Sequence, residues 1–492
     1  MQALDTTIAN VALPYMQGSL SASLDQINWV LTSYIVASAV MTAPIGWMSN
    51  RFGRKKLFVI CVAGFTFASL LCATAQNIDQ MVFYRLLQGM CGASLVPLSQ
   101  ALMLDAYPSE QRGQAMAIWG MGVMLGPIMG PTLGAWLTDH YSWHWVFLIN
   151  LPVGVVTVLG LLTFMDETEH QTHLRFDWFG FIALSVGIGS LQLMLDRGEQ
   201  LGWFGSTEIV AETIISVAGF YFFFAHSLTT GNAFINFALF KDRSFAGATI
   251  FMVVIGLVLY ATMALVTPYM QNVLGYPILT SGLLLGVRGI GTLFSMMAVG
   301  RLLAYIEART LVGIGLALTA ATLWQMVGFN QDTQAHTIVT VSIVQGVGLG
   351  LVFVPLSTVA FMSLPGALRT EGSAMLTLVR NVGSSIGISV VIANLTSTTQ
   401  LMHARLGEYV TPFNNALQMP DVANTLNLNT ELGKAMLDQI VTLQANVIAY
   451  SNDFVLLMWL TLASMPLLLI IGTSKKKADH APAPRNAVHA LD

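Results

Sequence analysis

Long apolar runs recur along the chain and decide what it can fold into. Because a helix rises about 1.5 Å per residue, about 20 apolar residues are enough to cross the hydrocarbon core of a bilayer. Backbone polar groups must pair among themselves in lipid, so each such run is expected to be a helix. Fourteen runs qualify, near 1–17, 26–49, 56–75, 80–104, 114–138, 143–165, 177–196, 207–227, 245–270, 278–304, 310–330, 336–363, 373–399 and 449–472. The predicted fold class is an all-α polytopic membrane protein.

Composition excludes the soluble classes. Charged residues make up 9% of the 492 residues, against about 25% in a soluble domain. The net charge of −4 gives no reason to expect a nucleic-acid partner. The three cysteines lie in apolar stretches and predict neither a disulfide framework nor a metal site. No nucleotide-binding P-loop, zinc-protease motif or nucleophile elbow is present, so we expect no enzyme, no cofactor and no ATP-driven cycle.

Basic residues predict the orientation. If both termini are cytoplasmic, the inner loops and the C-terminal tail hold fifteen Lys and Arg residues, and the outer loops hold three. The positive-inside rule therefore places both termini in the cytoplasm. The three remaining basic residues fall inside predicted helices, which is costly unless they face a cavity or an acid. They are Arg85, Arg288 and Arg380.

Two segments of the chain repeat each other. Residues 88–112 and 345–369 match at an offset of 257 positions, which pairs Gln88 with Gln345 and Arg112 with Arg369. Two halves of six spans at this offset leave two helices over, near 177–196 and 207–227. Repeated halves are typical of secondary transporters, whose substrate site lies between the repeats near the middle of the membrane.

Six short motifs occur in order along the chain. They are LDTTIANVALP (Leu4–Pro14), GWMSNRFGRKK (Gly46–Lys56), RLLQGMCGA (Arg85–Ala93), GVMLGPIMGPTLGAWL (Gly122–Leu137), LQLMLDRG (Leu191–Gly198) and WFG (Trp203–Gly205). With these motifs the sequence resembles the major facilitator superfamily. Within it, the chain is most similar to the fourteen-helix drug:proton antiporters of the EmrB type.

The resemblance implies a major facilitator fold and a domain organisation. Two six-helix bundles and two inserted helices are expected, in a bacterial inner membrane. The expected parts are an N-terminal bundle (1–165), two inserted helices (166–230), five helices of the C-terminal bundle (231–399), a periplasmic or extracellular loop (400–448), the last helix (449–472) and a cytoplasmic tail (473–492). In relatives that act across two membranes, this loop is a candidate docking element for a periplasmic adaptor (a membrane fusion protein) and an outer-membrane channel.

Asp5 is the only acid in the first predicted helix, and Arg85 is its natural partner. Burial favours the protonated carboxyl and a nearby guanidinium favours the carboxylate, so such a pair can load and release a proton. The resemblance implies that Asp5 carries the proton and Arg85 tunes it. Two alternatives stay open: Asp5 as a solvated helix-end carboxylate, since only four residues precede it, and Arg85 as a side chain that reaches the outer interface.

The loop between the second and third predicted helices departs from the family pattern. Its motif residues are Gly46, Asn50, Arg51, Gly53 and Arg54. Since an aspartate is usual at the position of Asn50, the ion pair that closes the inner side is expected to weaken to a hydrogen bond. Asp105 is a candidate partner for Arg51 or Arg54.

The fifth predicted helix carries glycines spaced by four, which share one face, and two prolines on the adjacent face. Glycines let another helix approach closely, and the prolines predict a bend. The resemblance implies that this helix packs between the bundles and seals them against proton leak. The motif residues are Gly122, Gly126, Pro127, Gly130, Pro131 and Gly134.

The expected function is export of hydrophobic or amphipathic compounds in exchange for protons by alternating access. Small hydrophobic substrates, protons and the bilayer are the expected partners, and Arg380 is a candidate cavity charge. One alternative is an exporter or symporter of a specific metabolite or siderophore. A passive channel or a membrane scaffold is the least favoured alternative.

Overall fold

The structure is a computed structural model. It describes residues 1–469 except 109–110, 168–174, 231–232, 363, 412, 416, 420–421, 423–425 and 428–429. The predicted tail 473–492, with its lysines, therefore lies outside the described residues.

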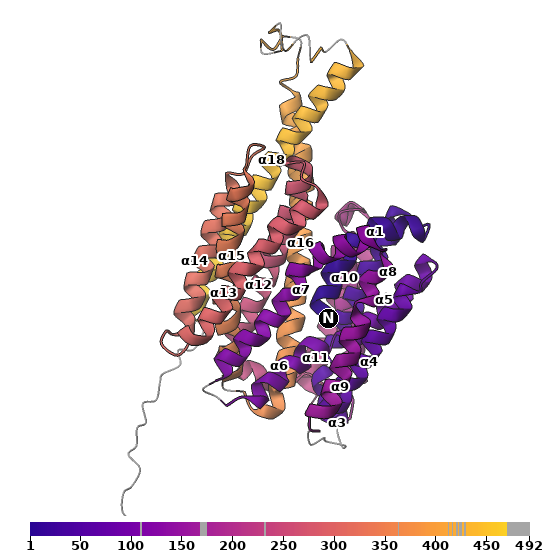
Figure 1. The fold of residues 1–492 in the computed structure, drawn as a ribbon, viewed down its shortest axis with the longest axis vertical. Coiled ribbons are helices and arrows are strands. Elements are labelled where there is room, and N and C mark those ends of the chain that lie inside the picture. Colours follow the sequence, from indigo (N-terminus) through magenta and orange to yellow (C-terminus); the bar gives the residue numbers. More distant parts are fainter. Residues whose placement is uncertain are drawn as a thin grey trace, which may run out of the picture.

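The described part of the chain is built from helices (Figure 1). An N-terminal group comprises α1 (Gln2–Ser19), α2 (Leu24–Thr42), α3 (Ile45–Phe52), α4 (Arg54–Ala73), α5 (Ile78–Gly92), α6 (Leu95–Ala106), α7 (Arg112–His140), α8 (His144–Leu148) and α9 (Asn150–Phe164). Two further helices follow, α10 (Trp178–Arg197) and α11 (Thr207–Thr229). A C-terminal group comprises α12 (Arg243–Pro268), α13 (Ile278–Leu302), α14 (Ala308–Val327), α15 (Ala335–Met362), α16 (Arg369–Gly407) and α18 (Glu431–Ser464).

The described chain has twelve helical spans that are long and apolar enough to cross a membrane, with α5 and α6 counted as one and α8 and α9 as one. The count is thirteen if α2 and α3, bent by 58°, also form one span. The protein is therefore a multi-pass membrane protein. The predicted count of fourteen is not reached by length and composition, because the short α1 carries Gln2, Asp5 and Asn10 and is too polar to qualify. The count of fourteen stays a prediction.

Prolines explain why three predicted spans are each divided in two. A proline lacks the N–H of a helix hydrogen bond and clashes with the carbonyl four residues before it. The interruptions fall at Pro44 between α2 and α3, at Ala93 four residues before Pro97, and just after Leu148 four residues before Pro152. The sequence-based prediction treated each pair as one helix because hydropathy does not register these interruptions.

The two groups of helices meet along α7 and α13. Gly113 of α7 lies against Leu303, Gly120 against Met296, and Pro131 against Gly282 of α13. Helices α10 and α11 pack on each other, and α10 touches both groups. It does so through Asp196, which accepts a hydrogen bond from Thr32 of α2, and through the carbonyl of Leu195, which accepts one from Ser389 of α16.

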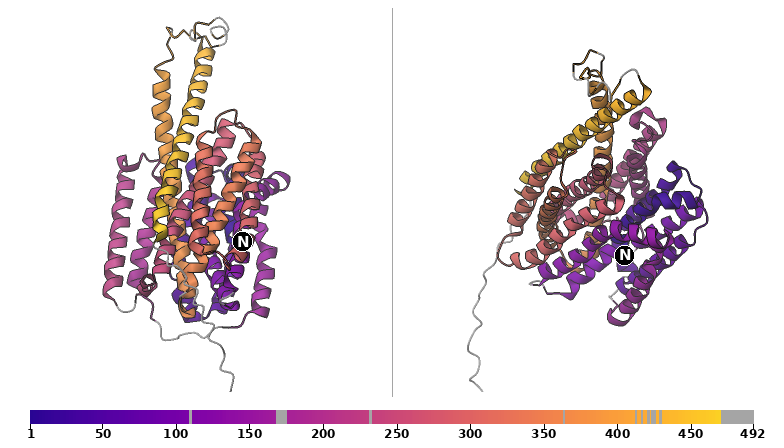
Figure 2. Two further views of the ribbon diagram at one scale, coloured as in Figure 1. Left: turned by 90° about the vertical axis from the view of Figure 1, so that its left-hand side faces the viewer. Right: turned by 45° about the horizontal axis from the view of Figure 1, so that its top comes forward.

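The two ends of the bundle differ. We call one the basic end, because α4, α7 and α16 begin there with Arg54, Arg112 and Arg369. From the opposite end, which we call the hairpin end, α16 and α18 project beyond the other helices (Figures 1 and 2). The segment 400–448, predicted as a loop with a helix-like stretch from Glu431 to Val447, contains the end of α16 at Gly407 and the start of α18 at Glu431. Its bounds as a periplasmic or extracellular loop stay a prediction. Hydropathy marks where a helix leaves the apolar layer, not where it stops.

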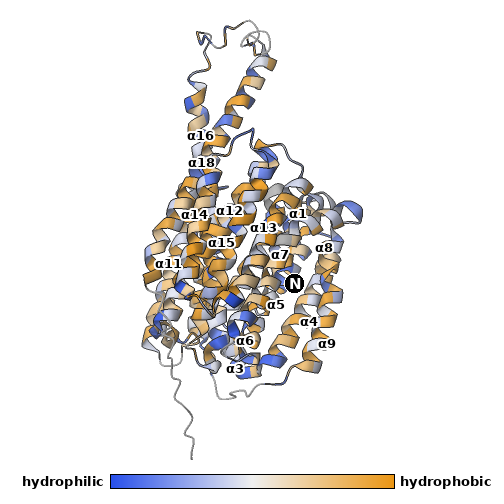
Figure 3. Ribbon diagram, turned by 60° about the vertical axis from the view of Figure 1, so that its left-hand side comes forward, coloured by the Kyte–Doolittle hydropathy of each residue, from blue (hydrophilic) through white to orange (hydrophobic). Residues whose placement is uncertain are grey.

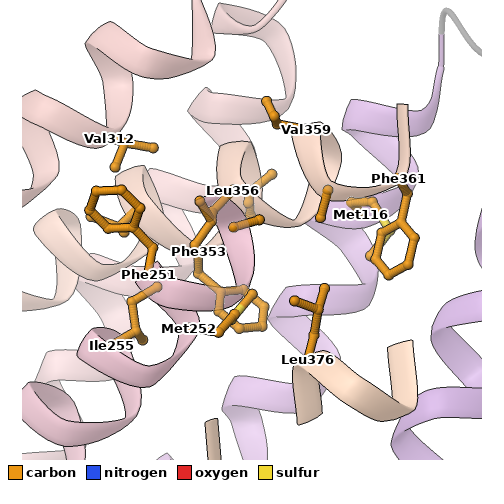
Figure 4. Close-up of a cluster of buried hydrophobic side chains, with 14 of the residues drawn as sticks. Met116, Phe251, Met252, Ile255, Val312, Phe353, Leu356, Val359, Phe361 and Leu376 are labelled. Carbon is orange, nitrogen blue, oxygen red and sulfur yellow. The ribbon is translucent and has the colours of Figure 1, made fainter. Parts of the chain in front are cut away.

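Apolar side chains from both groups close the basic end. Met116 of α7 packs in one cluster with Phe251 of α12, Phe353 of α15 and Leu376 of α16 (Figure 4). The ring of Trp119 stacks on Phe353 with 6.1 Å between centroids. Figure 3 shows that hydrophilic segments gather near α3 and α6 at this same end. The basic end is thus shut by side-chain packing as well as by polar contacts.

The glycine face of α7 packs on α1, inside the N-terminal group. A methyl group on Gly126 would meet the backbone of Ala3, on Gly130 it would overlap the Thr7 side chain, and on Gly134 it would meet Ile8. The proline face lies toward the other group, where Pro131 touches Gly282 of α13. The sealing role expected of this motif stays a prediction. The glycines instead let α1 approach α7 closely.

We expect Gly130→Ala to lower the free energy of unfolding by about 1–3 kcal/mol, the usual cost of overpacking. The added methyl group overlaps Thr7, whereas a methyl group at Gly122 would meet no atom within 4 Å. Denaturation of the purified protein in detergent measures the change. Gly122→Ala is the matched control and should be neutral, and adding Thr7→Ala should restore part of the loss. Equal effects at positions 122 and 130 would contradict this packing.

Candidate functional site

Asp5 and Arg85 form an ion pair inside the N-terminal group. Nη1 of Arg85, from α5, lies 2.5 Å from Oδ2 of Asp5, from α1. Both side chains have 0% exposure. The structure therefore places Asp5 away from solvent and not at a hydrated helix end, and Arg85 points inward and does not reach the interface. A charge at such depth needs a partner, and each side chain supplies it for the other.

Two amides complete the surroundings of the Asp5 carboxylate. Oδ1 accepts hydrogen bonds from Nε2 of Gln88 at 2.9 Å and from Nδ2 of Asn150 at 3.1 Å. The same two nitrogens lie 3.1 and 3.0 Å from Oγ of Ser69. That hydroxyl donates in turn to the carbonyl of Phe147 at 3.0 Å. Both carboxylate oxygens are thus held in a connected network, which fixes the carboxylate geometry.

Arg85 has partners besides Asp5. Its Nε donates to the carbonyl of Val30 in α2 at 3.0 Å, and its guanidinium carbon lies 4.2 Å from the centroid of the Tyr34 ring and 5.6 Å from that of Phe147. Aromatic faces stabilise a cation where water is excluded. Nη2 of Arg85 is buried without a hydrogen-bond partner. The guanidinium is thus held firmly but keeps one donor unused.

Glycines of α5 make the close approach to α2 feasible. A methyl group at Gly89 would meet the carbonyl oxygen of Tyr34, and one at Gly92 would meet the Tyr34 hydroxyl and the Phe65 ring. The sequence RLLQGMCGA thus places Arg85 and two small residues on helix turns that face α2 and α4. Side chains at these glycines would push α2 away and take the Val30 carbonyl out of reach.

Asp105 joins the two groups of helices at the basic end. From the last turn of α6, its carboxylate accepts from Arg54 of α4 and from Arg369 of α16. Arg54 also donates to the carbonyl of Gly366 at 3.0 Å. The sequence left the partner of Asp105 open between Arg51 and Arg54, and the structure selects Arg54. One acid therefore holds two cations from opposite groups.

Two further contacts cross the groups beside this acid, one by packing (Glu371 on Gly46) and one by a hydrogen bond (Ser373 to Gln100). Glu371 of α16 packs directly against Gly46, where no larger residue would fit. Glu371 also accepts a hydrogen bond from the backbone N–H of Asn236. Ser373 donates to Gln100 of α6. The contacts of Glu371 with Gly46 and of Ser373 with Gln100 depend on the basic end being closed.

The rest of the loop motif acts locally. Gly53 has φ of +88°, which favours glycine. The Glu167 carboxylate accepts from the backbone N–H groups of Lys55 at 3.1 Å and Lys56 at 3.2 Å, at the start of α4. The hydrogen bond predicted for Asn50 is not found among the described residues, nor is an ion pair of Arg51. Arg54 with Asp105 supplies the closing contact instead.

Arg380 lies on α16 with 8% exposure, and no described residue forms a hydrogen bond or ion pair with its side chain. The structure does not bring it near Asp5 through any described contact.

Sequence reasoning missed three residues of the site. Gln88 was noted only for the repeat, although it stands one helix turn after Arg85, so that the two side chains share a face. Asn150 and Ser69 carried no signal beyond being polar residues in apolar runs. Polarity within a predicted span is a usable cue, but the partner of each group depends on how four helices pack.

Comparison with known proteins places the chain among transporters. Residues 1–388 match the family described as Major Facilitator Superfamily. The chain is 34% identical over 457 residues to the multidrug export protein EmrB of Escherichia coli (strain K12), which covers 92% of this chain and 89% of that protein. It is 34% identical over 418 residues to the fatty acid resistance protein FarB of Neisseria gonorrhoeae, covering 85% and 82%. Among solved structures, the human organic anion transporter MFSD10 (TETRAN) matches with a TM-score of 0.58 at 15% identity, covering 94% of this chain and 96% of that one.

We expect Asn150→Ala to reduce the free energy of unfolding by about 1.5–3 kcal/mol, because it removes a hydrogen bond to a buried charge. In an Asp5→Asn background the same change should cost clearly less, since the charged acceptor is gone. A double-mutant cycle on the purified protein in detergent measures this coupling. The exposed Asn10 of α1 is the control, and Asn10→Ala should be additive with Asp5→Asn. Additivity for Asn150 would show that the amide and the carboxylate do not interact.

Proposed function

Because the chain belongs to the Major Facilitator Superfamily, we propose that it exports hydrophobic or amphipathic toxic compounds in exchange for protons, by alternating access. Relatives that match most of the chain carry the names multidrug export protein and fatty acid resistance protein. Their names support export of apolar compounds by this chain. The likeness to solved transporters supports the fold alone.

The observation that carries proton coupling is the fully buried Asp5–Arg85 pair. Breaking a buried ion pair by neutralising one partner costs about 3–5 kcal/mol, because the other charge stays uncompensated. Protonation of Asp5 removes the negative charge of the pair and leaves the buried Arg85 guanidinium uncompensated. Protonation therefore disfavours the arrangement seen here and favours one in which the guanidinium meets water or another acceptor.

The closed basic end bears on the second requirement of alternating access, a gate that opens and closes. Asp105, Arg54 and Arg369 connect the two groups of helices, and these contacts must separate for that end to open. We assign the basic end to the cytoplasm, on the excess of Lys and Arg that the sequence places there. In this orientation the closed end faces the cytoplasm of a bacterium, and the protein lies in its inner membrane.

We also propose that the projecting part of α16 and α18 is the contact for a periplasmic adaptor. It extends from the end opposite Arg54 and Asp105 (Figure 2). A rigid helical pair that stands clear of the bundle offers a partner a surface outside the lipid. The adaptor would pass the substrate on to an outer-membrane channel.

Asp5→Asn should abolish proton-driven export while leaving substrate binding in place. The amide keeps the size of the carboxyl group but cannot take up a proton. Efflux from everted vesicles measures export, and substrate-induced proton release from the purified protein measures proton exchange; both should be lost. Equilibrium binding of the substrate to the purified protein is measured separately and should be retained. Asp5→Glu, which keeps the carboxyl group, should retain part of the activity.

The control for this substitution is Asp79→Asn, an exposed acid at the start of α5. It should leave all these measurements unchanged. Full export by Asp5→Asn, with proton release intact, would refute the carrier role of Asp5.

Asp105→Asn should favour opening of the basic end, because Arg54 and Arg369 would face each other without an anion. Ser373, fully buried between the groups, reports this opening when it is changed to cysteine in a chain whose own three cysteines are replaced. Its reaction with a membrane-permeant maleimide should speed up severalfold in Asp105→Asn. Asp79→Asn again serves as the control, and an unchanged rate in Asp105→Asn would contradict a gate held by this acid.

A further inference from the structure

Two arginines of the C-terminal group are buried without a partner. Arg288 of α13 is 7% exposed and Arg380 of α16 is 8% exposed. Neither side chain forms a hydrogen bond or ion pair with any described residue, and the Nε atom of each is buried and unsatisfied. A guanidinium inside a membrane span is costly and is normally neutralised. Their retention without a protein partner points to a partner from outside the chain.

The acids of the same group do not neutralise these cations. Glu371 accepts the backbone N–H of Asn236 at the basic end. Asp453 of α18 accepts from Asn394 at 2.6 Å. These are the two acids buried in the described spans of the C-terminal group. Oδ2 of Asp453 has no partner among the described residues, but no described contact joins either acid to Arg288 or Arg380. The N-terminal group differs sharply, because its buried arginine has Asp5.

A third unsatisfied donor lies at the depth of Arg288. Gln345 of α15 is 2% exposed, and its Nε2 has no partner among the described residues. Arg288 and Gln345 each stand ten residues from the hairpin-end start of their helices, which is about 15 Å along each axis. The helices touch at this level, since a methyl group at Gly346 would meet the carbonyl oxygen of Arg288. The sequence repeat pairs Gln345 with Gln88, the amide that binds the Asp5 carboxylate.

The chemistry of the unsatisfied atoms selects the ligand. The Nε of Arg288 and the Nε2 of Gln345 are both donors, so the missing group must be an acceptor. A guanidinium fits a carboxylate in geometry as well as in charge. Leu285 lies one helix turn from Arg288 toward the hairpin end, and Leu349 lies one turn from Gln345 toward the basic end, so apolar side chains flank the two donors on both sides.

We propose that Arg288 and Gln345 form a binding site for the carboxylate of an amphipathic organic anion. Arg380 supplies a second unpaired cation, about 16 Å along α16 from the basic end, and extends the positive charge across the C-terminal group. The site rests on the proposed export function and names its substrate class: an apolar chain with a carboxylate head. The proton site and the substrate site then lie in different groups of helices.

The test is binding of 11-(dansylamino)undecanoic acid to the purified full-length protein in nanodiscs, read by dansyl fluorescence. Its uncharged methyl ester and a quaternary ammonium of equal chain length are the comparison probes. The wild-type protein should bind the acid at least about tenfold more tightly than the ester, as expected for charge-assisted hydrogen bonds in a dry site. Arg288→Gln should remove most of this preference and leave ester binding unchanged, and Gln345→Leu should reduce it less.

Arg301→Gln is the matched control, because Arg301 lies on the same helix and is exposed at the basic end. It should bind all three probes as the wild type does. Arg288→Lys keeps the charge without the planar fork and should bind the acid with intermediate affinity, which separates a binding role from a folding role.

Equal wild-type affinities for acid and ester, or an unchanged acid preference in Arg288→Gln, would overturn the site. In that case, proton-driven export of an uncharged compound would still be measurable, and the proposed function would stand. If the wild-type protein showed no proton-driven export of any compound tested, the proposed function itself would be refuted.

Discussion

A carboxylate and a guanidinium that meet without water hold the N-terminal group together. Burying either charge alone would cost several kcal/mol, at about 3–5 kcal/mol for a broken pair, whereas the pair is neutral. The helices that surround the pair must therefore keep the positions that hold the two charges together. The Asp5 carboxylate is bonded to Asn150 of α9, whose amide also bonds Ser69 of α4. The Arg85 guanidinium is bonded to the Val30 carbonyl of α2. Five helices thus share one neutral centre, and the charge state of that centre bears on how all of them pack.

The two halves of the molecule treat buried charge differently. The N-terminal group balances its cation internally, whereas the cations of the C-terminal group, Arg288 and Arg380, stay unbalanced by the described residues. The sequence repeat makes the comparison direct, because Ser342 stands in the C-terminal half where Arg85 stands in the N-terminal half. If the two proposals hold, the two repeated halves have diverged so that one handles the proton and the other the ligand. In that arrangement, proton and substrate do not compete for the same side chain, and their exchange is coupled through the movement of the two groups of helices.

The sequence predicted the membrane class, most of the helices and the pairing of Asp5 with Arg85, because long apolar runs and rare buried charges are local signals. It did not predict the breaks before Pro97 and Pro152, since hydropathy averages over them. Nor did it find Asn150 and Ser69, whose roles arise from contacts between residues far apart in the chain. The glycines of α7 were correctly read as a packing surface, but which helix they meet depends on tertiary arrangement.

Helix α16 runs without interruption from Arg369 to Gly407. Its 39 residues span about 58 Å, from the Asp105 contact, past Arg380, to the far side of the bilayer. A tilt of about 10° at one terminus displaces the other by about 10 Å, since a helix of this length acts as a lever arm. A partner bound to the projecting end of α16 would therefore be displaced when the contact of Arg369 with Asp105 at the other end breaks.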